Sequence, residues 1–334
     1  MMPDGRQVHA LVTGANGFIG SHLVDALAAR GFHVRCFVRP TGNLRWLRDR
    51  ELEILTGTLD DQDALQAACR GVDYVFHVAG ALTAVRAANY YTVNTEGTRA
   101  VATAARAASP ALVRFLFVSS LAAAGPSHAN EQPRVEADPC RPVSDYGRSK
   151  LLAEQCLRDE FAGLPVTVIR PPAVYGPRDA ATLAFPKLVQ HGIAPVFGWR
   201  PRKLSLVYVS DLVDGMIAAA ESPLARGHTY FLAHPRAVLW QELYAAVGRA
   251  VKRRYLCLRL PLALGYAAAL AADAGSRISG TASHLSYQKM REIAQPGWVC
   301  ASTAAQRDFG FTCHCDLDAG LQRAVEWYRD HGWL

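Results

Sequence analysis

The chain has 334 residues, of which 50% are hydrophobic and 19% are charged. This composition excludes an intrinsically disordered protein and leaves room for one large or two smaller domains with a sizeable core. The formal net charge is +7, but no long basic run or tail carries it, so the sequence does not favour a nucleic-acid-binding protein.

The first predicted strand runs from Val8 to Val12. It follows a polar segment, residues 1–7, that lacks the apolar core of a signal peptide. After the strand comes the glycine-rich stretch TGANGFIG, residues 13–20, which leads into a predicted helix from Phe18 to Ala29. A glycine-rich turn between a strand and a helix exposes backbone N–H groups at a helix N-terminus, where they bind anions.

Each glycine of this stretch has a distinct expected use. Gly14 allows the tight turn, Gly17 the close approach of a phosphate, and Gly20 the packing of the helix on the strand. The stretch therefore predicts a nucleotide-binding site that suits a pyrophosphate.

Strands and helices alternate through the first half of the chain, and the predicted strands are almost continuously apolar. This pattern favours an α/β fold with a doubly wound parallel sheet that helices cover on both faces. We expect residues 1–170 to form a dinucleotide-binding Rossmann domain. Residues 171–334 would form mainly a smaller substrate-binding part, interleaved with its last strands and helices. The further predicted elements are strands Val34–Val38, Leu52–Thr56, Tyr74–Val78, Leu112–Ser119 and Val166–Arg170, and helices Gln62–Cys69, Asn94–Ala108 and Tyr146–Phe161.

A second motif is Tyr146-Gly147-Arg148-Ser149-Lys150 at the start of a predicted helix. Positions i and i+4 share one face of a helix, so Lys150 would lie beside Tyr146. A neighbouring ammonium favours the phenolate and moves the pKa of a tyrosine toward a useful range. Because ligands of open parallel sheets bind at the carboxyl ends of the strands, Ser120, which follows a predicted strand, could hydrogen-bond a substrate oxygen there.

The segment Leu256–Ala272 is apolar except for Arg259 and is interrupted by Pro261 and Gly265. It is too short to span a bilayer. One interpretation is a buried helix of the C-terminal part. The other is a lipophilic lid or a shallow, peripheral membrane contact beside the active site.

The eight cysteines are scattered, and several, such as Cys36 and Cys257, lie in apolar runs. This distribution indicates reduced thiols and a cytoplasmic protein rather than a disulfide framework. The cluster Cys313-His314-Cys315 has no second Cys/His pair at finger spacing, so no metal site is predicted.

These motifs, in this order, resemble those of the extended short-chain dehydrogenase/reductases of the epimerase–dehydratase superfamily, and the resemblance covers nearly the whole chain. Besides residues 13–20, it includes Ser120, Tyr146 and Lys150. The remaining matching stretches are VFHVAG at 75–80, Val93-Asn94 with Gly97-Thr98, RPPAVYGPR at 170–178, VSDL at 209–212, EWY at 326–328 and Gly332-Trp333.

The resemblance implies roles for individual residues. Tyr146 would act as the acid/base, Lys150 as its partner and Ser120 as the group that polarises the substrate oxygen. It also implies a homodimer formed through the helices Asn94–Ala108 and Tyr146–Phe161. The implied cofactor-binding residues are Gly14, Asn16, Gly17, Phe18, Ile19, Gly20, Arg39, Asp60, Ala79, Tyr146, Lys150 and Pro171.

Three positions depart from the family pattern. Thr58 stands where many members carry an aspartate that contacts the adenine, although Asp60 is close. Ala173 and Leu204 replace an asparagine and an arginine that sugar-nucleotide members often carry. These departures favour the dihydroflavonol-reductase and 3β-hydroxysteroid-dehydrogenase branches. The expected reaction is hydride transfer between the cofactor and a ketone or secondary alcohol, and the expected substrate is a small molecule with a bulky apolar body. The alternative is a nucleotide-sugar epimerase or dehydratase that retains NAD.

The residue after the second predicted strand bears on the cofactor. NAD-selective folds of this type place Asp or Glu about 20 residues past the glycine loop, where it accepts from the ribose 2′-OH. Here the corresponding stretch is Phe37-Val38-Arg39-Pro40. Arg39 cannot accept a hydrogen bond, but it can pair with a 2′-phosphate. The sequence thus predicts that NADP(H) is preferred over NAD(H), unless Arg39 stacks on the adenine instead.

Overall fold

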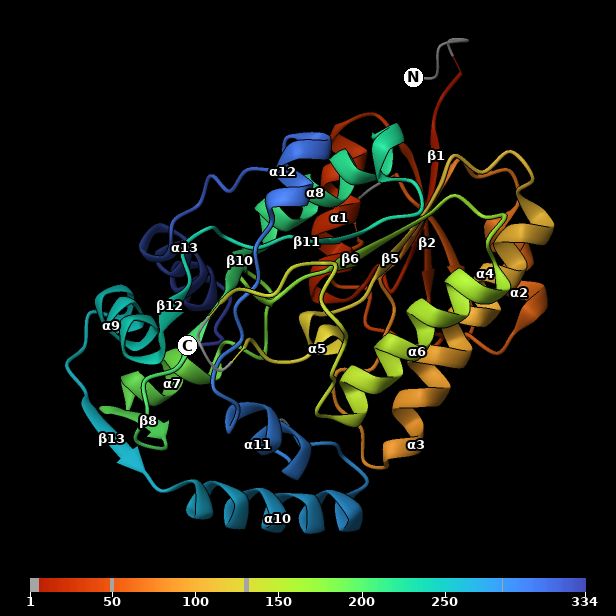
Figure 1. The fold of residues 1–334 in the computed structure, drawn as a ribbon. Coiled ribbons are helices and arrows are strands. Elements are labelled where there is room, and N and C mark those ends of the chain that lie inside the picture. Colours follow the sequence, from red (N-terminus) through yellow and green to blue (C-terminus); the bar gives the residue numbers. More distant parts are fainter. Residues whose placement is uncertain (1–5, 49–50, 129–131, 284) are drawn as a thin grey trace.

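The computed structural model describes residues 6–48, 51–128, 132–283 and 285–334. Residues 1–5, most of the N-terminal segment that we predicted to lack a signal peptide, lie outside the described residues. A parallel sheet with helices on both faces occupies one side of the molecule, and a smaller part, built mainly from the C-terminal half, lies beside it (Figure 1).

The sheet has the strand order β11-β6-β5-β4-β1-β2-β3, and all its neighbouring strands run parallel. The chain starts in the middle with β1, moves out to β3, and then crosses to β4 on the other side of β1. This confirms the predicted doubly wound α/β fold and places a switch point between β1 and β4, where such sheets bind ligands. The strands of this sheet are β1 (His9–Thr13), β2 (His33–Val38), β3 (Glu53–Thr56), β4 (Tyr74–His77), β5 (Arg114–Val118), β6 (Val166–Arg170) and β11 (Thr229–Phe231).

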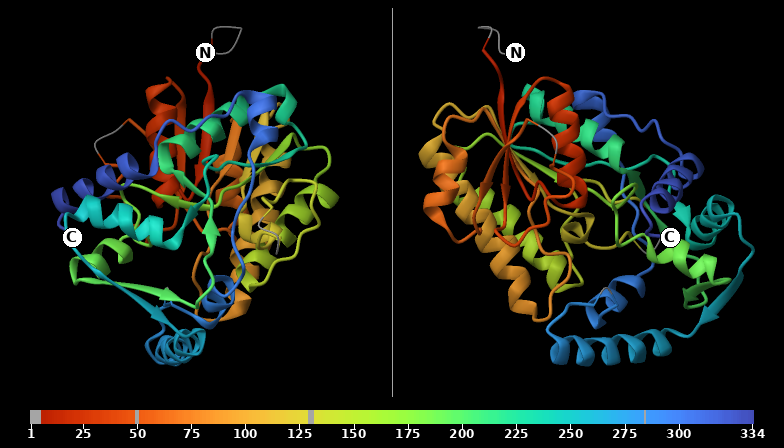
Figure 2. Two further views of the ribbon diagram at one scale, coloured as in Figure 1. Left: turned by 60° about the vertical axis from the view of Figure 1, so that its left-hand side comes forward. Right: turned by 180° about the vertical axis from the view of Figure 1, so that it is seen from behind.

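Two hydrophobic clusters cover the two faces of the sheet. Helices α1 and α8 cover one face, and helices α2, α4 and α6 cover the other (Figure 2). Their buried side chains form the two clusters. The central strands β4 and β5 are buried at every position, which explains why their sequences, YVFH and RFLFV, are mainly apolar rather than alternating. The helices of this half are α1 (Phe18–Ala29), α2 (Gln62–Cys69), α3 (Ala87–Tyr90), α4 (Gly97–Ala108), α5 (Leu121–Ala124), α6 (Asp145–Glu160) and, from later in the chain, α8 (Val209–Glu221).

The helix predicted over 94–108 differs from the structure at its start. Helix α3 begins at Ala87, and a π-helical turn, η1 (Tyr91–Glu96), joins it to α4. Asn94 is fully buried inside this turn and hydrogen-bonds outside the helix. Because π turns lodge an extra residue in a helix, they are often found where a side chain has a task besides helix formation.

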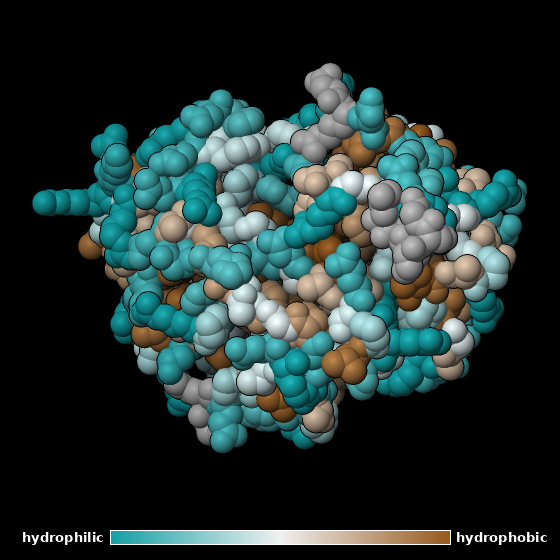
Figure 3. All heavy atoms as spheres, turned by 90° about the horizontal axis from the view of Figure 1, so that it is seen from above, coloured by the Kyte–Doolittle hydropathy of each residue, from teal (hydrophilic) through white to brown (hydrophobic). Residues whose placement is uncertain are grey.

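A third cluster forms the core of the smaller part. The face seen from above in Figure 3, on the side of the molecule opposite α10, is mainly hydrophilic, with hydrophobic side chains in small separate patches. The remaining elements are β7 (Ala173–Tyr175), α7 (Ala184–Gln190), β8 (Ile193–Phe197), β9 (Lys203–Leu204), β10 (Leu206–Tyr208), η2 (Pro223–Ala225), β12 (Val238–Leu239), α9 (Trp240–Val251), β13 (Leu256–Leu260), α10 (Leu262–Ser279), α11 (Tyr287–Ile293), α12 (Thr303–Phe309) and α13 (Leu317–Asp330).

The apolar segment Leu256–Ala272 is not a buried helix. It forms strand β13, which pairs with β8, and, after Pro261, the N-terminal part of α10, up to Ala272. Only Gly265, Ala269 and Ser276 of α10 are buried. Among the described residues, no helix has the length and apolar character needed to cross a bilayer.

Candidate active site

The glycine loop lies at the carboxyl end of β1, at the switch point of the sheet. Gly14 has a φ of 68°, and a Cβ on it would lie 2.8 Å from the Cα of Ala79, just after β4. Gly17 precedes the first turn of α1, and its N–H donates to the Gly14 carbonyl at 3.0 Å. A Cβ on Gly20 would overlap the Gly14 carbonyl oxygen. Side chains are thus excluded where backbone and a pyrophosphate would approach most closely, so the loop fits a dinucleotide.

The other loop residues support this turn. The Asn16 amide donates to the Asn43 carbonyl at 3.2 Å, which ties the loop to the segment after β2. Phe18 and Ile19 are partly buried against the core on the α1 face.

His77, at the end of β4, links the strands on either side of the switch point. Its ring nitrogens hydrogen-bond to the hydroxyls of Thr13, 2.7 Å away, and Thr98, 3.0 Å away. Burial, together with the charge of Lys150, lowers the pKa of His77 to about 3, so this imidazole is neutral and structural near pH ~7.

Arg39, Asp60 and Pro171 follow β2, β3 and β6, all at the carboxyl edge of the sheet. The Arg39 side chain is exposed. Asp60 is also exposed, and a hydrogen bond from the Thr58 side chain lowers the pKa of its carboxyl. Pro171 is buried, and its carbonyl accepts from the Leu121 N–H at 2.9 Å, which holds it beside the loop that carries Ser120.

Ser120 and Tyr146 lie at the N-terminal ends of two different helices, and a hydrogen bond joins their side chains. Ser120 caps α5, where its Oγ accepts from the Ala122 N–H at 3.1 Å. Tyr146 lies in the first turn of α6, which Ser144 caps. Burial raises the pKa of the Tyr146 phenol above its ordinary value, while a side-chain hydrogen bond with Ser120 acts in the opposite direction. This shift is opposite to the lowering that we expected from Lys150, because the desolvation of the phenol dominates.

Lys150 lies one turn beyond Tyr146 on α6, and its side chain is 4% exposed. Its ammonium donates to the Val118 carbonyl at 2.9 Å, at the end of β5. Burial lowers the pKa of Lys150 to about 8, and the charge of Glu154 partly opposes this shift. A Cβ on Gly80 would lie 2.9 Å from the Lys150 Nζ, so glycine at that position makes room for the ammonium.

Asn94 is a positioning residue to which we had assigned no role from the sequence. Its amide donates to Ser149 Oγ at 2.9 Å and to the Ala81 carbonyl at 3.2 Å, while its oxygen accepts from the Ala81 N–H at 2.8 Å. It thereby joins the loop after β4 to α6, one residue before Lys150. The VN motif contained this residue, but the π turn that places it became visible only in the structure.

A buried ion pair lies behind Lys150. Glu154, one turn further along α6, accepts from Arg170 Nη2 at 2.5 Å and from the Ser119 hydroxyl at 2.5 Å. Glu154 and Arg170 are 7% and 5% exposed. Burial alone would lower the pKa of Arg170, but the hydrogen bonds and charge of Glu154 outweigh it and raise this pKa above its ordinary value. The two residues lie on α6 and β6, and no sequence pattern had linked them.

Helix α11 covers the start of α6. Glu292 accepts from the Ser144 hydroxyl at 2.7 Å, and Gln288 donates to Asp145 at 2.6 Å. The ring of Tyr90 meets that of Tyr146 edge-on at 6.1 Å. The negative charge of Glu292 adds to the upward shift in the pKa of Tyr146.

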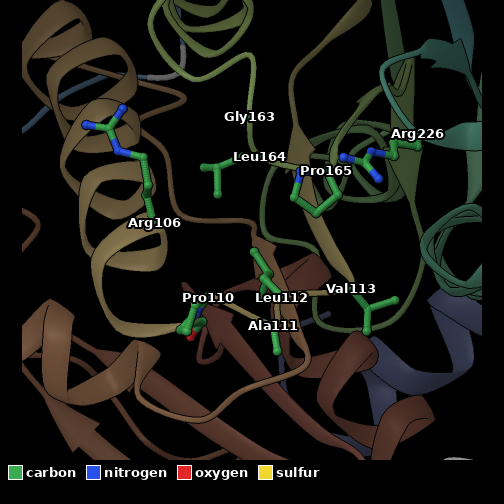
Figure 4. A pocket seen from close by; sticks show the side chains of 10 residues that line it. Arg106, Pro110, Ala111, Leu112, Val113, Gly163, Leu164, Pro165 and Arg226 are labelled. Atoms are coloured by element: carbon green, nitrogen blue, oxygen red, sulfur yellow. The ribbon is translucent and has the colours of Figure 1, made fainter.

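The hollow shown in Figure 4 lies at the opposite edge of the sheet. It measures about 570 Å³ and is lined by residues 109–113 and 163–165, which precede β5 and β6, together with Arg106 and Arg226. Since open parallel sheets bind cofactors at the carboxyl ends of their strands, this hollow is not the cofactor site.

Three comparisons place the chain among known proteins. Ceramide reductase from Caulobacter vibrioides is 32% identical over 335 residues, which cover 100% of this chain and 98% of that one. The 4-hydroxy-2-methyl-3-oxo-4-farnesyl-3,4-dihydroquinoline-1-oxide ketoreductase of Stigmatella aurantiaca is 34% identical over 67% of this chain and 68% of its own length. The crystal structure of gox2253 superposes with a TM-score of 0.81 at 26% identity and covers 98% of this chain and 100% of the other.

The model of the NAD dependent epimerase/dehydratase family matches residues 10–233. That range contains the glycine loop, Ser120, Tyr146 and Lys150, all at the carboxyl edge of the parallel sheet. The chain therefore belongs to the NAD dependent epimerase/dehydratase family, the extended short-chain dehydrogenases/reductases, and is an NAD(P)-dependent oxidoreductase.

Proposed function

We propose that the enzyme transfers hydride between a nicotinamide cofactor and a ketone or secondary alcohol of a bulky apolar molecule, such as a sterol-like or terpenoid compound. One observation carries the proposal. Ser120, which follows β5, lies within hydrogen-bonding reach of Tyr146 in α6, and Ser120 and Tyr146 are partly buried. Lys150, one turn further along α6, is 4% exposed and lies against Gly80, next to the Ala79 that contacts the glycine loop.

Each residue has a defined task in this reaction. When bound, the cofactor supplies or accepts the hydride. Tyr146 donates a proton to the substrate oxygen during reduction, since its raised pKa keeps the phenol protonated, and Ser120 polarises that oxygen. Lys150 would hold the nicotinamide ribose, while Asn94 fixes the turn of α6 that carries Lys150.

Two apolar residues support an apolar substrate. Leu204, where sugar-nucleotide members often carry arginine, is 6% exposed and packs in the core of the smaller part with Val238 and Leu206. Leu121, next to Ser120, is buried in an apolar cluster with Phe231. The names of the two relatives also support an apolar substrate, because a ceramide is a lipid and the Stigmatella ketone carries a farnesyl group.

The second candidate is a nucleotide-sugar epimerase or dehydratase that keeps its NAD. The same fold and the same Tyr–Lys pair favour it. A screen of NADPH oxidation against ketosteroids, farnesylated ketones, 3-ketoceramides and nucleotide sugars separates the two. Turnover of at least one apolar ketone supports the proposal. Tight calorimetric binding of a UDP- or dTDP-sugar, with no response to any apolar ketone or alcohol, would overturn it.

We also propose that NADP(H) is preferred over NAD(H), because Arg39 is exposed just after β2 and can pair with a 2′-phosphate. Arg39→Ala should weaken NADPH binding about tenfold or more while NADH changes little. Arg70→Ala, a change at another exposed arginine, is the control. If Arg39→Ala weakened the binding of NADPH and NADH equally, Arg39 would instead contact the adenine.

A homodimer through α4 and α6 remains a proposal. Ala104 is buried inside the protomer, whereas Ala107 of α4 and Leu152 of α6 are exposed. Light scattering that gives a concentration-independent monomer mass would refute it.

We also propose a reducing, cytoplasmic location. All eight cysteines lie in the described part of the chain, and all carry free thiols.

A further inference from the structure

Helix α10 presents an apolar stripe to solvent along its whole length. Leu264, Leu270 and Ile278 are 56%, 57% and 90% exposed. Exposed alanines lie between them at helical spacing: Ala263, Ala267, Ala271 and Ala274. A surface helix of a soluble domain normally carries polar side chains on its outer face, so this stripe, which we call the α10 surface, calls for an apolar contact.

Trp199 extends this surface at one end. It follows β8, which pairs with β13, and the ring of Phe197 reaches Gly265 in the first turn of α10. Trp199 is 65% exposed. Figures 1 and 2 show α10 at the outer edge of the molecule, away from the parallel sheet.

Basic side chains border the α10 surface at its Trp199 end: Arg259 of β13 donates to the Trp199 carbonyl at 3.4 Å, and Arg202 donates to the Phe197 carbonyl. The segments that carry these residues, 193–204 and 256–272, contain no Asp or Glu, and Arg200 next to Trp199 is exposed. Within α10 the only acid is Asp273, which accepts from the Tyr287 N–H of α11 at 2.9 Å. Arg277 is exposed in its last turn.

We propose that α10 binds to the surface of a bilayer that contains anionic lipids. Leu264, Leu270 and Ile278 would enter the boundary between headgroups and acyl chains, with Trp199 at the interface and arginines such as Arg200 and Arg259 on the lipid phosphates. A second copy of this chain is disfavoured as the partner, because a two-fold contact would set one basic border against the other.

The α10 surface is connected to the active site by direct contacts. Tyr266 of α10 meets Tyr287 of α11 at 5.5 Å between ring centroids. Glu292 of α11 in turn binds Ser144, the cap of α6 two residues before Tyr146. Binding of α10 to a bilayer would therefore bring the active site toward the lipid from which a lipophilic substrate is delivered. This delivery rests on the function proposed above, whereas the binding of α10 to the bilayer does not.

The test is cosedimentation with vesicles of phosphatidylcholine, alone or mixed equally with phosphatidylglycerol. Wild-type protein should bind the mixed vesicles. The double variant Leu264→Glu, Leu270→Glu should bind at least tenfold more weakly, because two buried apolar side chains are lost. Leu224→Glu changes a leucine that is 63% exposed in η2 and should bind like wild type.

The electrostatic part is tested by Arg200→Glu and Arg259→Glu. Each should lower binding to the mixed vesicles about fivefold or more, and added salt should remove the difference. No binding by the wild-type protein, or equal binding by the α10 double variant, would overturn the proposal. A dimer mass that Leu264→Glu converts to a monomer would assign the surface to a second copy. None of these measurements needs turnover, so they remain decisive if the proposed reaction is wrong.

Discussion

Helices α6 and α10 have similar lengths but opposite distributions of side chains. In α6, Ser149, Lys150 and Glu154 are buried, whereas in α10 Leu264, Leu270 and Ile278 are exposed. Both arrangements oppose the hydrophobic effect, which favours buried apolar and solvated polar groups. Buried polar groups must be paired, and exposed apolar groups need an apolar contact. In α6 hydrogen bonds and ion pairs within the protein meet this need, and for α10 we propose that a bilayer does.

The largest expected effect concerns Tyr146. Tyr146→Phe should lower the turnover of an apolar ketone by roughly 10²–10⁴-fold, because the proton donor is lost, while NADPH binding, followed by fluorescence, stays close to wild type. Leu270→Glu in α10, assayed with the same ketone dispersed in detergent, should keep its activity. Near-full activity of Tyr146→Phe would remove Tyr146 from the chemistry.

The next effect concerns the buried pair behind Lys150. Glu154→Ala leaves the Arg170 guanidinium buried without its carboxylate, so the free energy of unfolding should fall by about 3–5 kcal/mol. Urea unfolding followed by circular dichroism measures it. The double variant Glu154→Ala, Arg170→Met should recover much of this loss. A single variant as stable as wild type would mean that the pair contributes nothing to folding.

The third effect is a pH dependence set by Lys150. Its pKa is about 8 in the folded protein against an ordinary 10.5, so in this range the unfolded chain binds more protons. The contribution of Lys150 to the free energy of unfolding should therefore rise with pH between about 8 and 10.5, by about 3 kcal/mol in all. The difference in unfolding free energy between wild type and Lys150→Met should show this rise. A flat difference would contradict the burial of a lysine with a lowered pKa.

The smallest effect is expected in α10. Leu270→Ala should change the free energy of unfolding by no more than about 0.5 kcal/mol, since its side chain already contacts water. Leu157→Ala in α6, where the leucine is 1% exposed, should cost about 2–5 kcal/mol. Thermal unfolding of the two variants compares them directly. A large loss for Leu270→Ala would show that α10 packs against protein in solution.

Much of the cofactor half followed from the sequence alone. The bounds of α1, α2 and β6 agree with the predicted ones, because apolar periodicity and continuous apolar strands are local properties of the chain. The glycine loop and the Tyr146–Lys150 spacing were equally readable, since each depends on residues close together in sequence.

Tertiary structure decided the rest, because it depends on contacts between distant segments. The π turn that directs Asn94 toward Ser149, the Glu154–Arg170 pair and the docking of α11 on the cap of α6 each join residues from different elements. The division of Leu256–Ala272 into β13 and an exposed α10 could not be predicted either. An apolar run has the same sequence whether protein or lipid covers it, and only the folded chain shows which of its faces remains open.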